Sequence, residues 1–222
     1  MPVITISREV GSEGDDIAER VAQTLGYHFV DKEFIGAVLS QYGVVEFDRE
    51  YETLPSFWEK FNAQREKRRD AMVNMLHQVV RAVAHHGNVV ILGRSGFAVL
   101  GGFANVLHVR LQAPLSVRVK RVMMQQQMTT AQAEAVVNES DRVQVAFVEE
   151  FCGVSWEASR TFDLVINTGK IPSDLATTWV VNAVNAFAAI QETDQPTAGS
   201  IEVDPILASA ISDMLKCKVA HR

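Results

Sequence analysis

The stretch Val3–Leu25, VITISREVGSEGDDIAERVAQTL, decides the fold. A β-branched run predicts a buried strand, Gly11 and Gly14 lie in a turn, and the apolar residues that follow recur on one helical face. In a parallel α/β fold, such a turn directs free N–H groups and the positive helix end to one point. A phosphate-binding loop and an ordinary strand-to-helix turn both fit the pattern, because the sequence lacks the Walker motif G-x-x-x-x-G-K-[ST].

The composition indicates a folded chain with a sizeable core. The 222 residues are 47% hydrophobic and have a formal net charge of −6. This acidic balance argues against a protein that mainly coats nucleic acid. The two cysteines, Cys152 and Cys217, are too few for a zinc cluster, and no disulfide framework is indicated. Because neither a signal peptide nor an apolar run of about 20 residues is visible, we expect a cytoplasmic protein without nucleic-acid or membrane partners.

Strands and helices alternate along the rest of the chain. Short apolar runs predict further strands at His28–Val30, Val89–Leu92, Val106–Arg110 and Leu164–Ile166. Periodic stretches between them predict helices, so we expect a parallel sheet covered on both faces.

Several boundaries follow from residue types. We expect a helical break at Met123–Met128, helix caps at Thr130 and Ser173, and an irregular segment at Gly43–Pro55. The composition of QETDQPTAGS indicates a linker. The predicted units are a domain at 1–190, a linker at 191–203 and a C-terminal helical tail at 204–222.

Two charged groups follow predicted strands, at the sheet edge where open α/β folds bind ligands. Asp31 and Lys32 come after the second strand, and Asp31 is also suited to cap the next helix; the two roles are compatible. Arg94 follows Val89–Leu92 and Gly93, where a guanidinium group can bind a phosphate.

Four segments together resemble the cytidylate-kinase-like family of P-loop proteins: ITISREVGSEGDDIAERVAQTLG, VDKEFI, VVILGR and TFDLVINTG. The resemblance runs in order from about Val3 to about Ile190. It implies an α/β, P-loop kinase-like three-layer fold, in which a five-stranded parallel sheet is flanked by helices and carries a helical insert and a lid. It also implies phosphoryl transfer from ATP, with Mg²⁺, to a nucleoside monophosphate or a similar small acceptor.

The first loop carries the resemblance with two departures. Ser7, Arg8, Gly11, Ser12 and Gly14 match the branch pattern S-R-x-x-G-S-G-G-[RK], which implies that they bind the donor phosphates. Glu13 replaces a glycine, and Asp15 replaces the usual basic residue. Two carboxylates beside a polyphosphate repel it unless a metal ion or Arg8 compensates. An ungapped match places Asp16 on the hydroxyl residue that helps to hold Mg²⁺. Both aspartates also suit a first helical turn, so a helix-dipole role stays open.

Further arginines take roles by the same resemblance. Arg94 resembles the acceptor-phosphate arginine of the D-G-R-D signature, although Leu92 and Ser95 replace its flanking acids. Arg118 and Arg121 are similar to lid arginines, and Arg142 lies in a dipeptide that resembles the D-[KR] after the lid. Asp31 or Lys32 would help to place the acceptor.

Two main functions follow from these residues. In the first, the chain is an active nucleotide kinase. In the second, it is a catalytically degenerate kinase-fold module that binds a nucleotide or a protein partner, which Glu13 and Asp15 favour. A third hypothesis makes the chain chiefly a structural homodimer, for which the tail helix and three aromatic residues, Phe57, Trp58 and Phe61, offer apolar surface.

Overall fold

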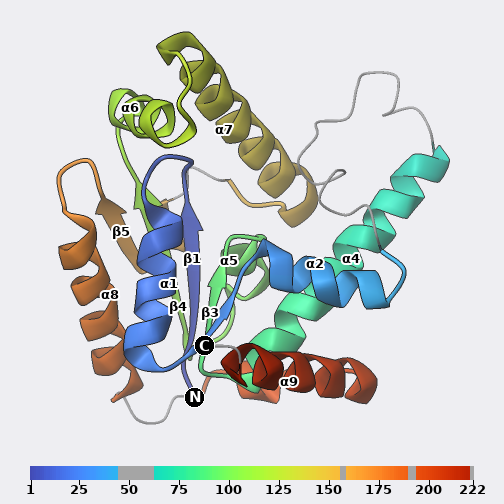
Figure 1. Cartoon of the computed structure of the whole chain (residues 1–222). Coiled ribbons are helices and arrows are strands. Elements are labelled where there is room, and N and C mark those ends of the chain that lie inside the picture. Colours follow the sequence, from blue (N-terminus) through green and yellow to red (C-terminus); the bar gives the residue numbers. More distant parts are fainter. Residues whose placement is uncertain (45–62, 156–158, 190–193, 221–222) are drawn as a thin grey trace.

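Figure 1 shows the computed structural model, which describes residues 1–44, 63–155, 159–189 and 194–220. The side chains of residues 63–66, 159 and 217–220 are not described either. Phe57, Trp58, Phe61 and most of the predicted segment Gly43–Pro55 therefore lie outside the described residues.

A five-stranded parallel sheet forms the centre of the molecule, as expected. The strand order is β2-β3-β1-β4-β5, so β1 lies in the middle, between β3 and β4. The strands are β1 (Val3–Arg8), β2 (His28–Val30), β3 (Val89–Leu92), β4 (Val106–Gln112) and β5 (Leu164–Asn167). Because all five are parallel, their carboxyl ends meet at one edge, the upper edge in Figure 1.

Helices and two short 3₁₀ turns make up the remaining regular structure of the described residues. They are α1 (Gly14–Leu25), α2 (Lys32–Gln41), α4 (Ala63–His86), α5 (Gly96–Val99), α6 (Leu115–Gln126), α7 (Thr130–Cys152), η2 (Ser159–Thr161), α8 (Ser173–Ala188), η3 (Ala198–Ser200) and α9 (Pro205–Ala220).

The two faces of the sheet pack against different helices, which gives three layers. Strand residues alternate between the faces. Ile4 and Ile6 join a buried cluster with residues of α1 and α8. Val3 and Ile91 join a second buried cluster with residues of α2, α4 and α9. Figure 1 shows α6 and α7 above the carboxyl edge of the sheet.

Three predicted boundaries were wrong by a few residues. The helix α6 continues through Met123 to Gln126, because the glutamines that suggested a break are good helix formers. Thr129, not Thr130, caps α7: its side chain accepts from the Gln132 N–H in a capping box. Ser173 is the first residue of α8 rather than its cap.

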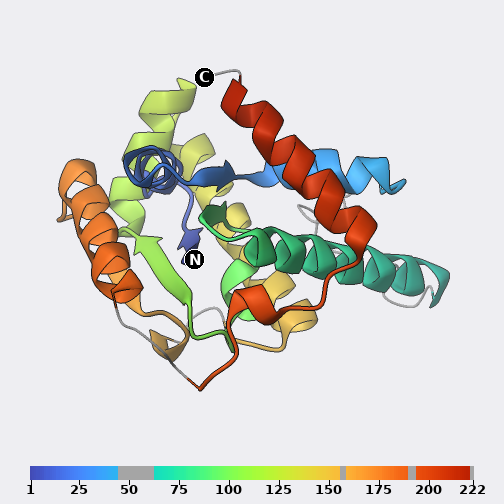
Figure 2. The ribbon, with the colours of Figure 1, turned by 90° about the horizontal axis from the view of Figure 1, so that it is seen from below.

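The C-terminal tail packs into the core of the molecule. Leu207, Ile211 and Leu215 of α9 are each at most 3% exposed and lie in the same apolar cluster as α4. α9 contacts α4, and in the view from below the beginning of α9 lies beside α4 (Figure 2). Before α9, buried Ala198 donates its N–H to the Asn105 side chain, 2.6 Å away. The division into domain, linker and tail stays a prediction.

Among the described residues, no helix is both long enough and apolar enough to span a membrane.

Candidate functional site

The loop between β1 and α1, residues 9–13, lies at the carboxyl edge of the sheet. The Glu9 N–H donates to Leu111 O at 3.2 Å, and the Ser12 N–H and hydroxyl both donate to Glu9 O, at 3.1 and 2.7 Å. Within the described part of the chain, the N–H groups of Gly11, Glu13, Gly14 and Asp15 donate no hydrogen bond. Unbonded amides at a helix N-terminus suit an anion.

Gly11 brings this loop against the helix α6. Its φ is +80°, a left-handed value that favours glycine. A Cβ at this position would lie 2.7 Å from Arg118 O and 2.9 Å from Arg118 Cα. The loop and the backbone of α6 are therefore as close as a glycine permits.

Arg8 lies on the other side of the loop. Its side chain covers Gly14, where a Cβ would lie 2.6 Å from Arg8 Cγ, and Gly93, where a Cβ would lie 2.8 Å from Arg8 Nη1. Its guanidinium group pairs with Asp15, with 3.1 Å between Arg8 Nη2 and Asp15 Oδ1. Arg8 thus connects the β1 loop with the turn after β3, and it compensates the nearby Asp15 carboxylate.

Arg118 lies almost completely buried beneath the loop, with 6% of the residue exposed. It holds Asp141 of α7 in a bidentate pair, at 3.0 and 2.8 Å. Its Nε donates to Ala113 O at 3.0 Å and lies 3.3 Å from Glu9 Oε2. These contacts fix α6 and α7 relative to the loop, and they surround the cation with two carboxylates.

Arg121, one turn further along α6, lies across the loop. Its Nε is 3.0 Å from Glu13 Oε1. Its Nη1 donates to Gly11 O at 3.3 Å, and its Nη2 donates to Thr168 O at 2.9 Å. The Thr168 hydroxyl donates to Ser12 O at 2.8 Å, so the turn after β5 also contacts the loop.

Glu9 and Thr168 join this site, and sequence reasoning did not single out either residue. The Glu9 carboxylate accepts from the Ala113 N–H at 3.1 Å and pairs with Arg110 at 3.4 Å, besides Arg118. Glu9 directly follows β1, and Thr168 directly follows β5. Their position at the ends of parallel strands was the available signal.

The turn after β3 has an unusual backbone. Gly93, Arg94 and Ser95 have φ values of +70°, +51° and +55°. Left-handed values are costly for residues with a side chain and often occur at functional sites. Arg94 is 5% exposed, and its neighbour Gly93 lies under the Arg8 guanidinium group. Arg94 is therefore a buried residue in a strained turn at the carboxyl end of β3.

Asp31 caps α2, as predicted: its Oδ1 accepts from the Phe34 N–H at 2.8 Å. Lys32 begins that helix at the carboxyl end of β2. The same edge of the sheet thus carries both residues.

Two predicted site residues pair with side chains away from the loop. Arg142 is 66% exposed at its side chain and pairs with Glu139 on the same helix, which raises the pKa of Arg142. Asp16 is paired with Arg20, which also contacts Asp174 of α8. Arg8, Arg118 and Arg121 converge on the loop, whereas the structure gives Arg142 no contact with the loop among the described residues.

The described residues contain no group of three or more histidine, cysteine or acidic side chains that could bind a metal by themselves. Mg²⁺ usually needs only one or two carboxylates when phosphate oxygens and water complete its shell. Asp15 and Asp16 meet that requirement in the first turn of α1, with side chains 70% and 61% exposed. The donor set therefore fits Mg²⁺ that arrives with a phosphorylated ligand.

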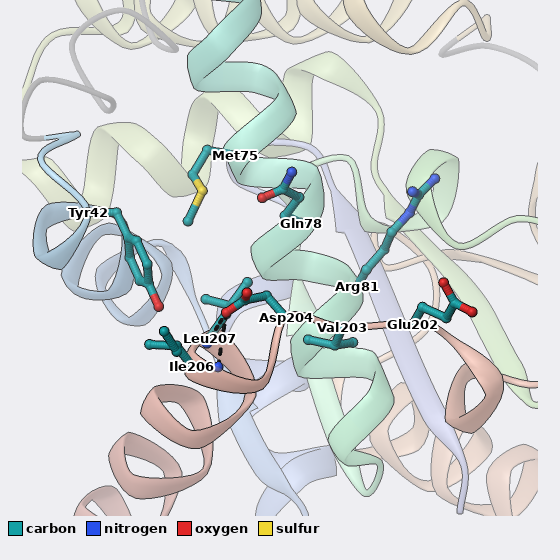
Figure 3. Close-up of a pocket in the computed structure, with 9 residues that line it drawn as sticks. All are labelled: Tyr42, Met75, Gln78, Arg81, Glu202, Val203, Asp204, Ile206 and Leu207. Carbon is teal, nitrogen blue, oxygen red and sulfur yellow. Dashed lines mark hydrogen bonds between the residues drawn. The ribbon is translucent and has the colours of Figure 1, made fainter.

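A pocket of about 650 Å³ lies away from this loop, between α4, the start of α9 and the end of α2. Figure 3 shows Met75, Gln78 and Arg81 of α4 on one side and Ile206 of α9 with Tyr42 on another. None of its lining residues belongs to the loop, α6 or α7.

Comparisons with known proteins decide the family. A sequence model described as the cytidylate kinase-like family matches residues 3–170. The chain belongs to this family. The family assignment covers all five strands, the β1 loop and the lid helices, whereas α8 and α9 lie beyond the matched residues.

This cytidylate kinase-like chain is also similar to individual proteins. It is 26% identical over 187 residues to a cytidylate kinase of Halobacterium salinarum, which covers 84% of the chain and 91% of that protein. A uronate isomerase of Corynebacterium glutamicum is 37% identical over 97 residues, only 42% of the chain and 18% of that much longer protein. An uncharacterised protein of Eubacterium ventriosum has a crystal structure with a TM-score of 0.64, 21% identity, and coverage of 84% and 99% of the two chains. The structural likeness shows that the two chains share this fold.

Proposed function

We propose that this chain transfers a phosphoryl group from ATP to a nucleoside monophosphate of the cytidylate type or a similar small acceptor. One observation carries the proposal: Arg8, Arg118 and Arg121 surround a loop in which the amides of Gly11 and Glu13 donate no hydrogen bond among the described residues. Phosphoryl transfer depends mainly on positioning and on cations around the moving group. Membership of the cytidylate kinase-like family and the similarity to a cytidylate kinase point to the same reaction.

In this proposal the β1 loop binds the donor. The amides of Gly11 and Gly14 donate to the phosphates, and Arg8 supplies a positive charge beside them. Ser7 and Ser12 are buried and hold the shape of the strand end and of the loop. Since the Ser12 hydroxyl donates to Glu9 O, its part is to fix the loop.

The acceptor and the transferring group use the neighbouring arginines. Arg94 binds the acceptor phosphate, with Asp31 or Lys32 beside it at the end of β2. Arg118 and Arg121 neutralise the group in transfer from the lid side. A role for Arg142 stays a prediction, which requires α7 to turn its exposed side toward the site.

Asp15 and Asp16 are the residues that would hold Mg²⁺, with Asp16 as the first candidate. The ion supplies neutralisation of the phosphate charge when it is bound. Before that, both carboxylates must leave their present partners, Arg8 and Arg20.

A second candidate function is a binding module without catalysis. The observation that favours it is the pairing of the lid cations: Arg118 holds Asp141 and Glu9, and Arg121 holds Glu13. A lid whose cations are already neutralised provides less stabilisation for a transition state.

Formation of ADP from ATP, with Mg²⁺ and a panel of nucleoside monophosphates, tests the proposal. The full chain is compared with Arg94→Ala and with Arg81→Ala, an equal change at the remote pocket. We expect acceptor-dependent ADP formation that Arg94→Ala lowers through a higher KM for the acceptor. If ATP binds but no acceptor stimulates ADP formation, the kinase function is refuted and the non-catalytic binding function is supported.

A further inference from the structure

Glu13 has a backbone conformation that its residue type disfavours. Its φ of 60° and ψ of 20° are left-handed, and Glu13 is the residue that caps α1. The left-handed region is unfavourable for a residue with a Cβ, whereas glycine enters it readily. Glu13 therefore ends the loop with a strained backbone, next to the unbonded amides of Gly14 and Asp15.

The Glu13 side chain also has a cationic partner that the lid provides. Arg121 binds Glu13 Oε1 at 3.0 Å and is itself held by Gly11 O and by Thr168. Both members of the pair are partly buried, with side chains 22% exposed for Arg121 and 33% exposed for Glu13. The carboxylate thus has the position and the partner that an incoming phosphate would need.

We propose that Glu13 is a specificity-determining residue that competes with the phosphates of the ligand for Arg121 and the loop. This inference rests on the proposed function in one respect, because it takes the loop as the site of a polyphosphate. When the ligand arrives, Arg121 exchanges the Glu13 carboxylate for a phosphate oxygen, and Glu13 becomes a like charge next to the ligand.

The exchange makes the loop sensitive to the charge of its ligand. A like charge repels a highly charged anion more strongly than a weakly charged one. Metal-free ATP carries more negative charge than its Mg²⁺ complex, so Glu13 penalises the metal-free form more. The loop therefore selects the metal-bound nucleoside triphosphate over the metal-free one.

Calorimetric titration of the chain of 222 residues tests this selection. Wild type, Glu13→Gln and Asp213→Asn are titrated with metal-free ATP, with ATP and Mg²⁺, and with inorganic tripolyphosphate. The glutamine keeps the size of the side chain and removes its charge. Asp213 pairs with Lys216 on the exposed side of α9, so Asp213→Asn removes the same charge far from the loop.

We expect Glu13→Gln to bind metal-free ATP and tripolyphosphate on the order of tenfold more tightly than wild type. Its affinity for the Mg²⁺ complex should rise less, and Asp213→Asn should match wild type. Unchanged or weaker binding of metal-free ATP by Glu13→Gln overturns the inference, as does an absence of binding by every variant.

The outcomes separate this inference from the proposed function. Tighter binding of metal-free ATP by Glu13→Gln, without any acceptor-dependent phosphoryl transfer, would support competition by Glu13 and refute the proposed kinase function. Phosphoryl transfer by wild type, together with weaker binding of metal-free ATP by Glu13→Gln, would refute competition by Glu13 and support the proposed kinase function.

Discussion

Gly11→Ala should separate the β1 loop from the lid helix, and its cost follows from two features of the structure. The new methyl group would lie 2.7 Å from Arg118 O, which is a backbone atom that no side-chain rotation can move. Overpacking of this kind costs about 1–3 kcal/mol. The left-handed φ of +80° adds about 1–2 kcal/mol for alanine. We therefore expect a loss of roughly 2–5 kcal/mol in the free energy of unfolding, the sum of these two effects.

The chain contains a matched control for this substitution. Gly26 also has a left-handed φ, +67°, but a Cβ there would have nothing within 4 Å. Gly26→Ala should cost only the backbone part, about 1–2 kcal/mol. Urea unfolding of both variants, monitored by circular dichroism, gives the difference between them. Equal losses in the two variants would refute the close approach of loop and lid.

Three further changes test other parts of the structure. Ile211→Ala should lower the free energy of unfolding by about 2–5 kcal/mol, because α9 buries this side chain in the main core. Ile206→Ala, at a residue that is 73% exposed, should change the free energy of unfolding by less than about 0.5 kcal/mol in the same urea titration. Arg118→Ala should cost about 3–5 kcal/mol, because it removes the cation that pairs with Asp141 and one of the two arginines that pair with Glu9. Asp141→Asn should cost less than half of that in the same urea titration, and similar losses would contradict a buried cation shared between two acids. Burial lowers the pKa of His108 in the folded chain, so the unfolded chain binds the proton more readily. The free energy of unfolding, measured at several pH values, should therefore fall as the pH drops through about 6.5. His108→Gln should make the free energy of unfolding depend less on pH in this range.

The central sheet could be predicted from sequence because its signals are local. Val89–Leu92 is an unbroken apolar run, four of the seven residues of Val106–Gln112 are apolar, and the alternation with helices implies parallel pairing. The cap at Asp31 was equally local, since only the next three residues decide it. The boundaries of α6 and α8 were less predictable, because glutamine and serine fit both a helix and its flank.

The electrostatics of the site could not be predicted, because its partners are far apart in sequence. Arg118 and Asp141 are 23 residues apart, and Arg118 and Val10 are 108 apart. Lid arginines could be recognised by resemblance, but their neutralisation by Glu9, Glu13 and Asp141 depends on the packing of α6 and α7 over the loop. Glu13 was singled out by sequence as a departure from the family pattern. Its pairing with Arg121 required the structure.

Calorimetric titration with ATP and Mg²⁺ tests the central claim, that the β1 loop is a donor-phosphate site, most directly. Wild type should bind, Arg8→Ala should bind about tenfold or more weakly because it loses a charge-assisted contact, and Arg81→Ala at the remote pocket should bind like wild type. Equal affinity of Arg8→Ala and wild type, or no heat from wild type with ATP or GTP, would contradict the claim.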